Sequence, residues 1–227
     1  MREIILDTET TGLDPFSGHR LVEIGCLEIM NCIPTGAFFH AYINPEREVP
    51  VEATKVHGLT QEFLKDFPLF SSLHEKFLDF IRDTPLVIHN AEFDLKFLNF
   101  ELNKALVPSL TNPVVDTLKV ARGLFPGSPA SLDALCRRFK VDTSNRRLHG
   151  ALVDCELLAS VYLELCGGRQ RGLGLVKEKK EEKAASSLVV SSDLAFHYQN
   201  RPFRAPRDFP ASQDEQEQHT VFVKTKL

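Results

Sequence analysis

The sequence predicts an α/β protein with a mixed central sheet flanked by helices, followed by a disordered C-terminal tail. Strand-like apolar runs come first, and up to residue 166 helix-like patterns alternate with short apolar runs. After Gly168 the composition becomes charged and polar. Early strands that suit antiparallel pairing, followed by alternating helices and strands, are typical of a mixed sheet.

Three strands are expected near the N-terminus. Residues 3–8 include three consecutive aliphatic side chains, and residues 21–30 show partial alternation. The third strand, 38–43, ends at Asn44-Pro45, which is a turn signal.

Helices and short strands follow. Residues 69–81 carry apolar side chains at the spacing of a core-facing helix. Ser131 is expected to cap the N-terminus of a later helix, with Asp133 favourably placed in its first turn. The remaining elements are expected, in order, at 86–88 (strand), 93–105 (helix), 114–115 (strand), 117–124 (helix), 132–139 (helix) and 151–165 (helix, ended by Gly167-Gly168).

Composition limits the possible environments and partners. No apolar run approaches the roughly 20 residues that span a bilayer, and the N-terminus lacks a signal pattern, so a soluble cytoplasmic protein without a membrane partner is expected. Five cysteines without a CxxC pair indicate reduced thiols. Residues 1–168 carry 16 basic and 23 acidic groups, whereas residues 169–227 carry 11 and 8. Because so acidic a body binds phosphates weakly, a nucleic-acid substrate would have to be delivered to it.

Two acids end the first strand. Asp7 and Glu9 are two residues apart, so their side chains point to the same side of the strand. Neighbouring carboxylates repel each other, and a divalent cation would offset that repulsion. Their oxygen ligands suit Mg²⁺ or Mn²⁺ better than zinc. The alternative is a strand end that enters solvent.

Two further segments supply the rest of a candidate site. Asp94 is expected in the first turn of a helix at the carboxyl edge of the sheet, where open α/β sheets bind ligands. His149 and Asp154 are five residues apart and would not share a helical face. We therefore expect His149 on the preceding loop, with Gly150 permitting the bend, and Asp154 in the early helix. Four converging acids would need about two cations, as in the two-metal sites that cut phosphodiesters, and His149 could serve as general base.

The ordered motifs LDTETTG, HNAEFD and HGALVD resemble those of the DEDDh 3′–5′ exonucleases, which have a ribonuclease H-like fold. Within that family the chain is most similar to the proofreading subunits of bacterial DNA polymerase III, a likeness that covers residues 1–168. The resemblance implies two divalent cations, Mg²⁺ or Mn²⁺. Asp7 would bridge both, Glu9 and Asp154 would complete one, Asp94 would support the second, and His149 would be the catalytic base.

The resemblance also implies that Glu52 and His57 contact the terminal nucleotide, although His57 could equally be a core or turn histidine. Phe93 is a candidate base-stacking wedge or a plain core residue, and Thr11 could also contact the 3′ end. The full expected substrate-binding set is Asp7, Thr8, Glu9, Thr10, Glu52, His57, Phe93 and Asp154.

The chain is thus expected to contain an exonuclease domain, 1–168, and a flexible tail, 169–227, that binds a sliding clamp and a polymerase catalytic subunit. Gln170, Leu173 and Leu175 resemble a clamp-docking peptide, although an ordinary linker would also fit. A small accessory subunit is a further expected partner. The expected function is metal-dependent 3′–5′ proofreading of frayed DNA ends, with release of nucleoside 5′-monophosphates. The alternatives are a free-standing exonuclease acting on RNA or short oligonucleotides, and a non-catalytic scaffold between clamp and polymerase.

Overall fold

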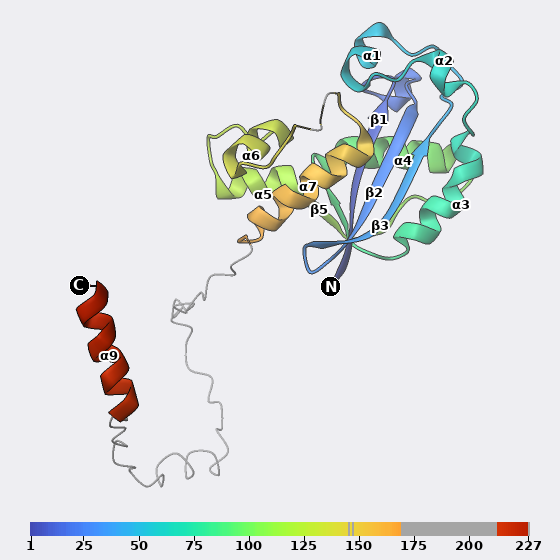
Figure 1. Ribbon diagram of the computed structural model, residues 1–227. Helices are drawn as coiled ribbons and strands as arrows, with labels where there is room; N and C mark the ends of the chain where they lie inside the picture. The colour runs from blue at the N-terminus through green and yellow to red at the C-terminus, as the bar shows by residue number, and fades with distance from the viewer. Residues whose placement is uncertain (145, 147, 169–212, 227) are drawn as a thin grey trace, which may run out of the picture. The chain divides into compact units, whose positions relative to one another are not determined.

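The computed structural model describes residues 1–168, except 145 and 147, and residues 213–226 (Figure 1). The chain divides into two compact units, Met1–Leu175 and Val176–Leu227. The elements of the first unit are, in order, β1 (Arg2–Thr10), a 3-10 turn (Pro15–Ser17), β2 (Leu21–Met30), β3 (Ile33–Tyr42), α1 (Val51–His57), α2 (Gln61–Leu64), α3 (Phe70–Ile81), β4 (Leu86–Ile88), α4 (Ala91–Lys104), β5 (Val114–Asp116), α5 (Thr117–Leu124), α6 (Leu132–Phe139) and α7 (Ala151–Leu165).

The five strands form one sheet in the order β3-β2-β1-β4-β5. β1 pairs antiparallel with β2 and parallel with β4, so the sheet is mixed, as the sequence predicts. Leu6 of β1 lies opposite Ile88, the last residue of β4. The carboxyl ends of these two parallel strands therefore meet at one edge of the sheet.

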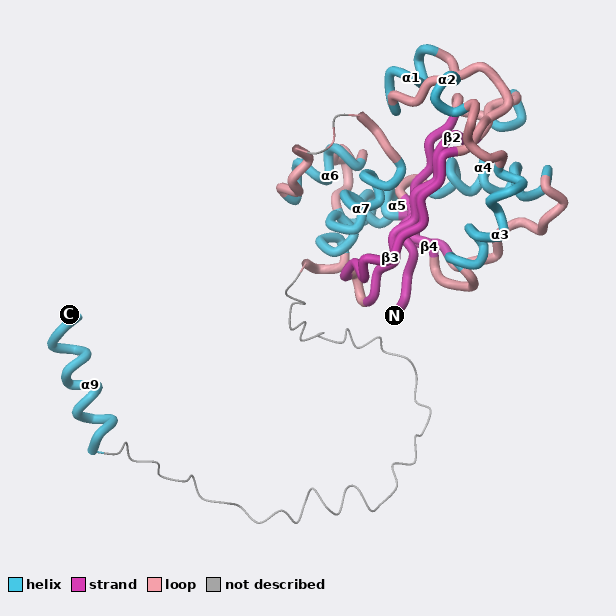
Figure 2. Tube along the Cα trace, turned by 45° about the vertical axis from the view of Figure 1, so that its right-hand side comes forward, coloured by secondary structure: helices cyan, strands magenta, loops and turns pink. Residues whose placement is uncertain are grey.

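Helices cover both faces of the sheet (Figures 1 and 2). Ile4 and Leu6 of β1 belong to one buried cluster with side chains of α3 and α4, whereas Ile5 belongs to another with side chains of α7. This alternation continues to the end of β1. It directs Asp7 and Glu9 toward α7, and Thr8 toward α4.

Gly25 of β2 sets how closely α7 approaches the sheet. A Cβ atom at this position would lie 2.5 Å from the carbonyl carbon of Ala151 and 2.6 Å from the backbone nitrogen of Leu152. Only glycine leaves room for the first turn of α7 at that distance. This close approach places the residues at the start of α7 beside the carboxyl end of β1.

Three elements differ from the prediction. Helices α1 and α2 were not expected; they are short, and their buried residues are His57 and Leu64. Strand β3 begins at Ile33 rather than 38, and its first half is exposed. Short segments with one buried side chain carry too little periodicity to be recognised in the sequence.

In the second unit the structure describes helix α9 (Gln213–Lys226). The side chains described in this helix, at 213, 214 and 216–220, are exposed. The expected clamp-docking residues Gln170, Leu173 and Leu175 lie outside the described residues. Among the helices that the structure describes, none is both long and apolar enough to cross a membrane.

Candidate active site

Asp7 and Glu9 lie near the end of β1, where they pair with Gly25 and Glu23 of β2. Burial raises the pKa of Asp7 well above its usual value, and the neighbouring Asp94 and Glu9 raise it further. Burial likewise raises the pKa of Glu9 to about 8, with added repulsion from Asp154. The two side chains thus lie partly buried and close to other acids.

Asp94 approaches the same group of acids from the first turn of α4. The helix begins after Asn90, which has a left-handed backbone (φ 68°). Asp94 is 3% exposed, and burial raises its pKa to about 7. The Thr8 hydroxyl donates a hydrogen bond of 2.7 Å to Asp94 Oδ1, which opposes that rise. Thr8 therefore holds an acid of the site, in addition to its predicted contact with substrate.

His149 and Asp154 belong to the segment at the start of α7, one before the helix and one within it, as the sequence predicts. Asp154 is buried in the first turn of α7, and His149 lies on the loop before it. The His149 backbone N–H donates to the Val56 carbonyl at 3.1 Å, which ties this loop to α1. His149 Nδ1 lies 3.2 Å from Asp154 Oδ2. The role expected of Gly150 is wrong: its φ of −155° is extended backbone that any residue adopts.

Arg146, which was not predicted from the sequence, also contacts this part of the site. Its Nε lies 2.6 Å from Asp154 Oδ1, and its Nη2 donates to Asp154 Oδ2 at 2.7 Å. The side chain is 9% exposed. Its position three residues before His149 was the only signal in the sequence, and an arginine in a polar loop is more often solvated.

The donor set fits a divalent cation. One ligand atom from each of Glu9, His149 and Asp154 can lie within 4.8 Å of one another. Carboxylate oxygens are the ligands that Mg²⁺ and Mn²⁺ prefer. Burial is the main cause of the raised pKa values of Asp7 and Glu9, and repulsion between the neighbouring acids adds to it. Bound cations would relieve this repulsion.

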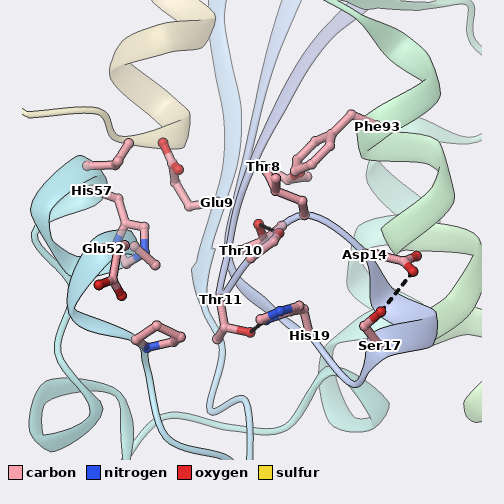
Figure 3. Close-up of a pocket in the computed structure, with 15 residues that line it drawn as sticks. Thr8, Glu9, Thr10, Thr11, Asp14, Ser17, His19, Glu52, His57 and Phe93 are labelled. Atoms are coloured by element: carbon pink, nitrogen blue, oxygen red, sulfur yellow. Dashed lines mark hydrogen bonds between the residues drawn. The ribbon is translucent and has the colours of Figure 1, made fainter.

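A cavity of about 620 Å³ opens beside Glu9 (Figure 3). Glu52 and His57 of α1 form one side, Phe93 of α4 forms the other, and the threonines of β1 lie between them. This volume is within the range of small-molecule sites. Six of the predicted substrate-binding residues line it: Thr8, Glu9, Thr10, Glu52, His57 and Phe93.

Several lining residues are also fixed within the protein. His57 is buried, its Nδ1 accepts a hydrogen bond of 3.0 Å from the Leu59 backbone N–H, and burial lowers its pKa. The Thr10 hydroxyl donates to the Gly12 carbonyl at 2.6 Å. Phe93 packs against Phe97 with ring centroids 5.2 Å apart. The wall of the cavity is thus preorganised, and these residues have packing roles as well as exposure to the cavity.

Comparison with known proteins agrees with this geometry. The RNase_T exonuclease family model matches residues 4–162. A DNA polymerase III subunit epsilon of Rickettsia felis is 48% identical over 232 residues, covering all of this chain and 97% of the relative. The Escherichia coli subunit epsilon is 47% identical over 197 residues, covering 83% of this chain and 81% of the relative.

Among solved structures, Exonuclease X in complex with 5′ overhanging duplex DNA superposes with a TM-score of 0.58 at 25% identity, over 72% of this chain and 90% of that one. This likeness confirms the predicted ribonuclease H-like fold. The identity extends over 97% of the Rickettsia felis relative and 81% of the Escherichia coli relative. The chain belongs to the exonuclease family and, within it, to the epsilon subunits of bacterial DNA polymerase III.

Proposed function

We propose that the chain is the proofreading subunit of a replicative DNA polymerase, a metal-dependent 3′–5′ exonuclease that releases nucleoside 5′-monophosphates from frayed DNA ends. The observation that carries this proposal is the group of ligand atoms from Glu9, His149 and Asp154 within 4.8 Å of one another, with Asp7 and Asp94 close enough to repel Glu9 or each other, beside a cavity of about 620 Å³. The family membership supports the same activity.

The four acids Asp7, Glu9, Asp94 and Asp154 would hold two divalent cations, Mg²⁺ or Mn²⁺. When bound, such ions lower the pKa of an attacking water and stabilise the leaving oxygen. His149, with 45% of its side chain exposed, is accessible to a water at the mouth of the site and would accept its proton. Its backbone bond to Val56 limits where the imidazole can lie.

The terminal nucleotide would occupy the cavity between Glu52 and His57 on one side and Phe93 on the other. The Phe93 ring would stack on a base, a contact worth roughly 1–3 kcal/mol that does not depend on base identity. An editing enzyme needs this tolerance, because any base can be misincorporated.

The acidic body explains why delivery would be needed. Residues 1–168 carry 16 basic and 23 acidic groups, so the domain attracts DNA weakly by itself. A polymerase that presents a frayed end would overcome this, and a mismatch lowers the cost of unpairing. We assign the contacts with the polymerase catalytic subunit, a sliding clamp and a small accessory subunit to residues 169–227, with Gln170, Leu173 and Leu175 as clamp contacts. The setting would be the cytoplasmic replisome.

The test uses full-length protein, 3′-labelled DNA primers with matched and mismatched ends, and a labelled RNA of equal length, with Mg²⁺ or Mn²⁺. The label should leave first, as a mononucleotide, and fastest from the mismatched DNA. His149→Gln should slow release about 10²–10⁴-fold and retain mononucleotide binding. His74→Gln, on α3, is the matched control and should leave the rate unchanged.

Three other outcomes would contradict the proposed catalysis, the proposed substrate or the proposed role of His149. Wild-type protein that stays inert with both metals would favour a non-catalytic scaffold. Faster cleavage of RNA than of mismatched DNA would favour a free-standing exonuclease. Retained activity in His149→Gln would remove His149 from its role as base.

A further inference from the structure

Asp154 already has a positively charged partner in the fold. The Arg146 guanidinium lies against both carboxylate oxygens, with Nε 2.6 Å from Oδ1 and Nη2 2.7 Å from Oδ2. In the described part of the chain, Arg146 is the only lysine or arginine that forms an ion pair with any of the four acids of the site. The pair is well shielded from water, since the two side chains are 9% and 5% exposed.

Arg146 also has partners outside the acid pocket. Its Nη1 forms an ion pair with Asp133, in the first turn of α6, and that carboxylate is 50% exposed. Its Nη2 lies 2.7 Å from His149 Nδ1. A guanidinium that gave up Asp154 would therefore keep a charged partner at the surface. It could leave the acid pocket without being left unpaired and buried, a state that is strongly unfavourable.

Arg146 and a divalent cation need the same oxygens. The guanidinium contacts both oxygens of Asp154, Oδ2 through a hydrogen bond from Nη2 and Oδ1 through the ion-pair contact of Nε, which is not a hydrogen bond. A metal ion bound directly to Asp154 would place a second cation against those oxygens, at a distance where two positive charges repel. Glu9, whose ligand atom lies within 4.8 Å of that of Asp154, would share the same ion. Repulsion between the two cations therefore sets Arg146 and the metal ion in competition for Asp154.

We propose that Arg146 is a resident counter-ion of the acid pocket that competes with the divalent metal for Asp154 and remains paired with Asp133 when the metal binds. This inference rests on the proposed metal-dependent function. In the metal-free protein Arg146 offsets the charge of Asp154 and fixes the loop that carries His149. Arg146 is thus a positioning residue whose removal tightens metal binding.

The test measures Mn²⁺ binding to metal-free, full-length protein from the electron paramagnetic resonance signal of free Mn²⁺. The Arg146→Gln variant should bind the Mn²⁺ ion at Asp154 and Glu9 about tenfold more tightly than the wild type does, because no arginine competes for Asp154. The matched control is Arg137→Gln on α6, which makes the same change in net charge at an exposed neighbour of Asp133. It should change the affinity less than twofold.

The Arg146→Lys variant distinguishes an effect of the guanidinium contact on Mn²⁺ affinity from an effect of net charge. Lysine keeps the charge but offers a point charge in place of a two-pronged fork. Competition through the fork predicts an affinity between those of wild type and Arg146→Gln, whereas an effect of charge alone predicts the wild-type value. Unchanged or weaker Mn²⁺ binding by Arg146→Gln would overturn the proposal.

A second measurement needs no stable variant. In ¹⁵N-arginine spectra of the wild type, the Nε–H proton of Arg146 should exchange slowly without metal and faster as Mg²⁺ is added. Unchanged exchange at saturating Mg²⁺ would also overturn the proposal. Wild-type protein that binds no Mn²⁺ and cuts no DNA would instead refute the proposed function, so the two failures are distinguishable.

Discussion

Substitution of Gly25 by alanine tests whether the close approach of α7 to the sheet sets the geometry of the active site. The added Cβ would meet the Ala151 carbonyl carbon at 2.5 Å, whereas ordinary contact begins at 3.4 Å. The atoms in the way belong to the backbone, so no side-chain rotation can relieve the clash. The start of α7 would have to move by about 0.9 Å relative to β2.

This displacement has two expected consequences. Overpacking of this kind costs about 1–3 kcal/mol of unfolding free energy. His149 and Asp154 would also move relative to Asp7 and Glu9, because the former pair lies at the start of α7 and the latter on β1. A misplacement near 1 Å in an active site can lower the rate by about 10²-fold.

Urea denaturation and release of a 3′-terminal nucleotide from a mismatched primer measure the two effects. The control is Gly123→Ala in α5, where an added Cβ meets nothing within 4 Å. That variant should keep its activity and gain about 0.4–1 kcal/mol of stability from a less flexible unfolded chain. A Gly25→Ala protein with wild-type stability and rate would show that the contact does not position the site.

Three further predictions follow from the same structure. The folded-state pKa of Glu9 is about 8 against an ordinary 4.5, so metal-free protein should lose stability as pH rises from 4.5 to 8. A melting temperature in EDTA that rises over this range would contradict the assignment, and Mg²⁺ should raise that temperature more at pH 8 than at pH 5. Thr8→Val should cost about 1–3 kcal/mol in urea denaturation, because it removes the donor to buried Asp94, and Thr220→Val on α9 should not. Deletion of residues 169–227 should preserve nuclease activity and abolish capture of a polymerase subunit in a pull-down, whereas unchanged capture would place those contacts in the domain.

Much of the site could be predicted because alternation along a strand is a strict rule. Asp7 and Glu9 follow a buried aliphatic run, so the spacing alone predicts that they point to the same side of the strand. The place of His149 before a helix also followed from geometry, since residues five apart cannot share a helical face. Ser131 caps α6 as predicted, with its hydroxyl accepting the Ala134 N–H at 3.3 Å.

Other features depend on contacts between distant segments. Arg146 meets Asp133 and Asp154 because α6 and α7 lie together, and no local pattern distinguishes it from a solvated arginine. The need for Gly25 arises from the backbone of Ala151, far along the chain. Helix α9 is rich in charged and amide side chains, so it lacks the apolar periodicity by which helices are recognised.

The most direct test of the central claim is a count of Mn²⁺ ions bound per chain, measured by equilibrium dialysis with and without a nucleoside 5′-monophosphate. The acids around Asp7 should bind two ions in the presence of the nucleotide, and Asp7→Asn should abolish at least one of them. Wild-type protein that binds no Mn²⁺ at millimolar concentration, with or without nucleotide, would contradict the account.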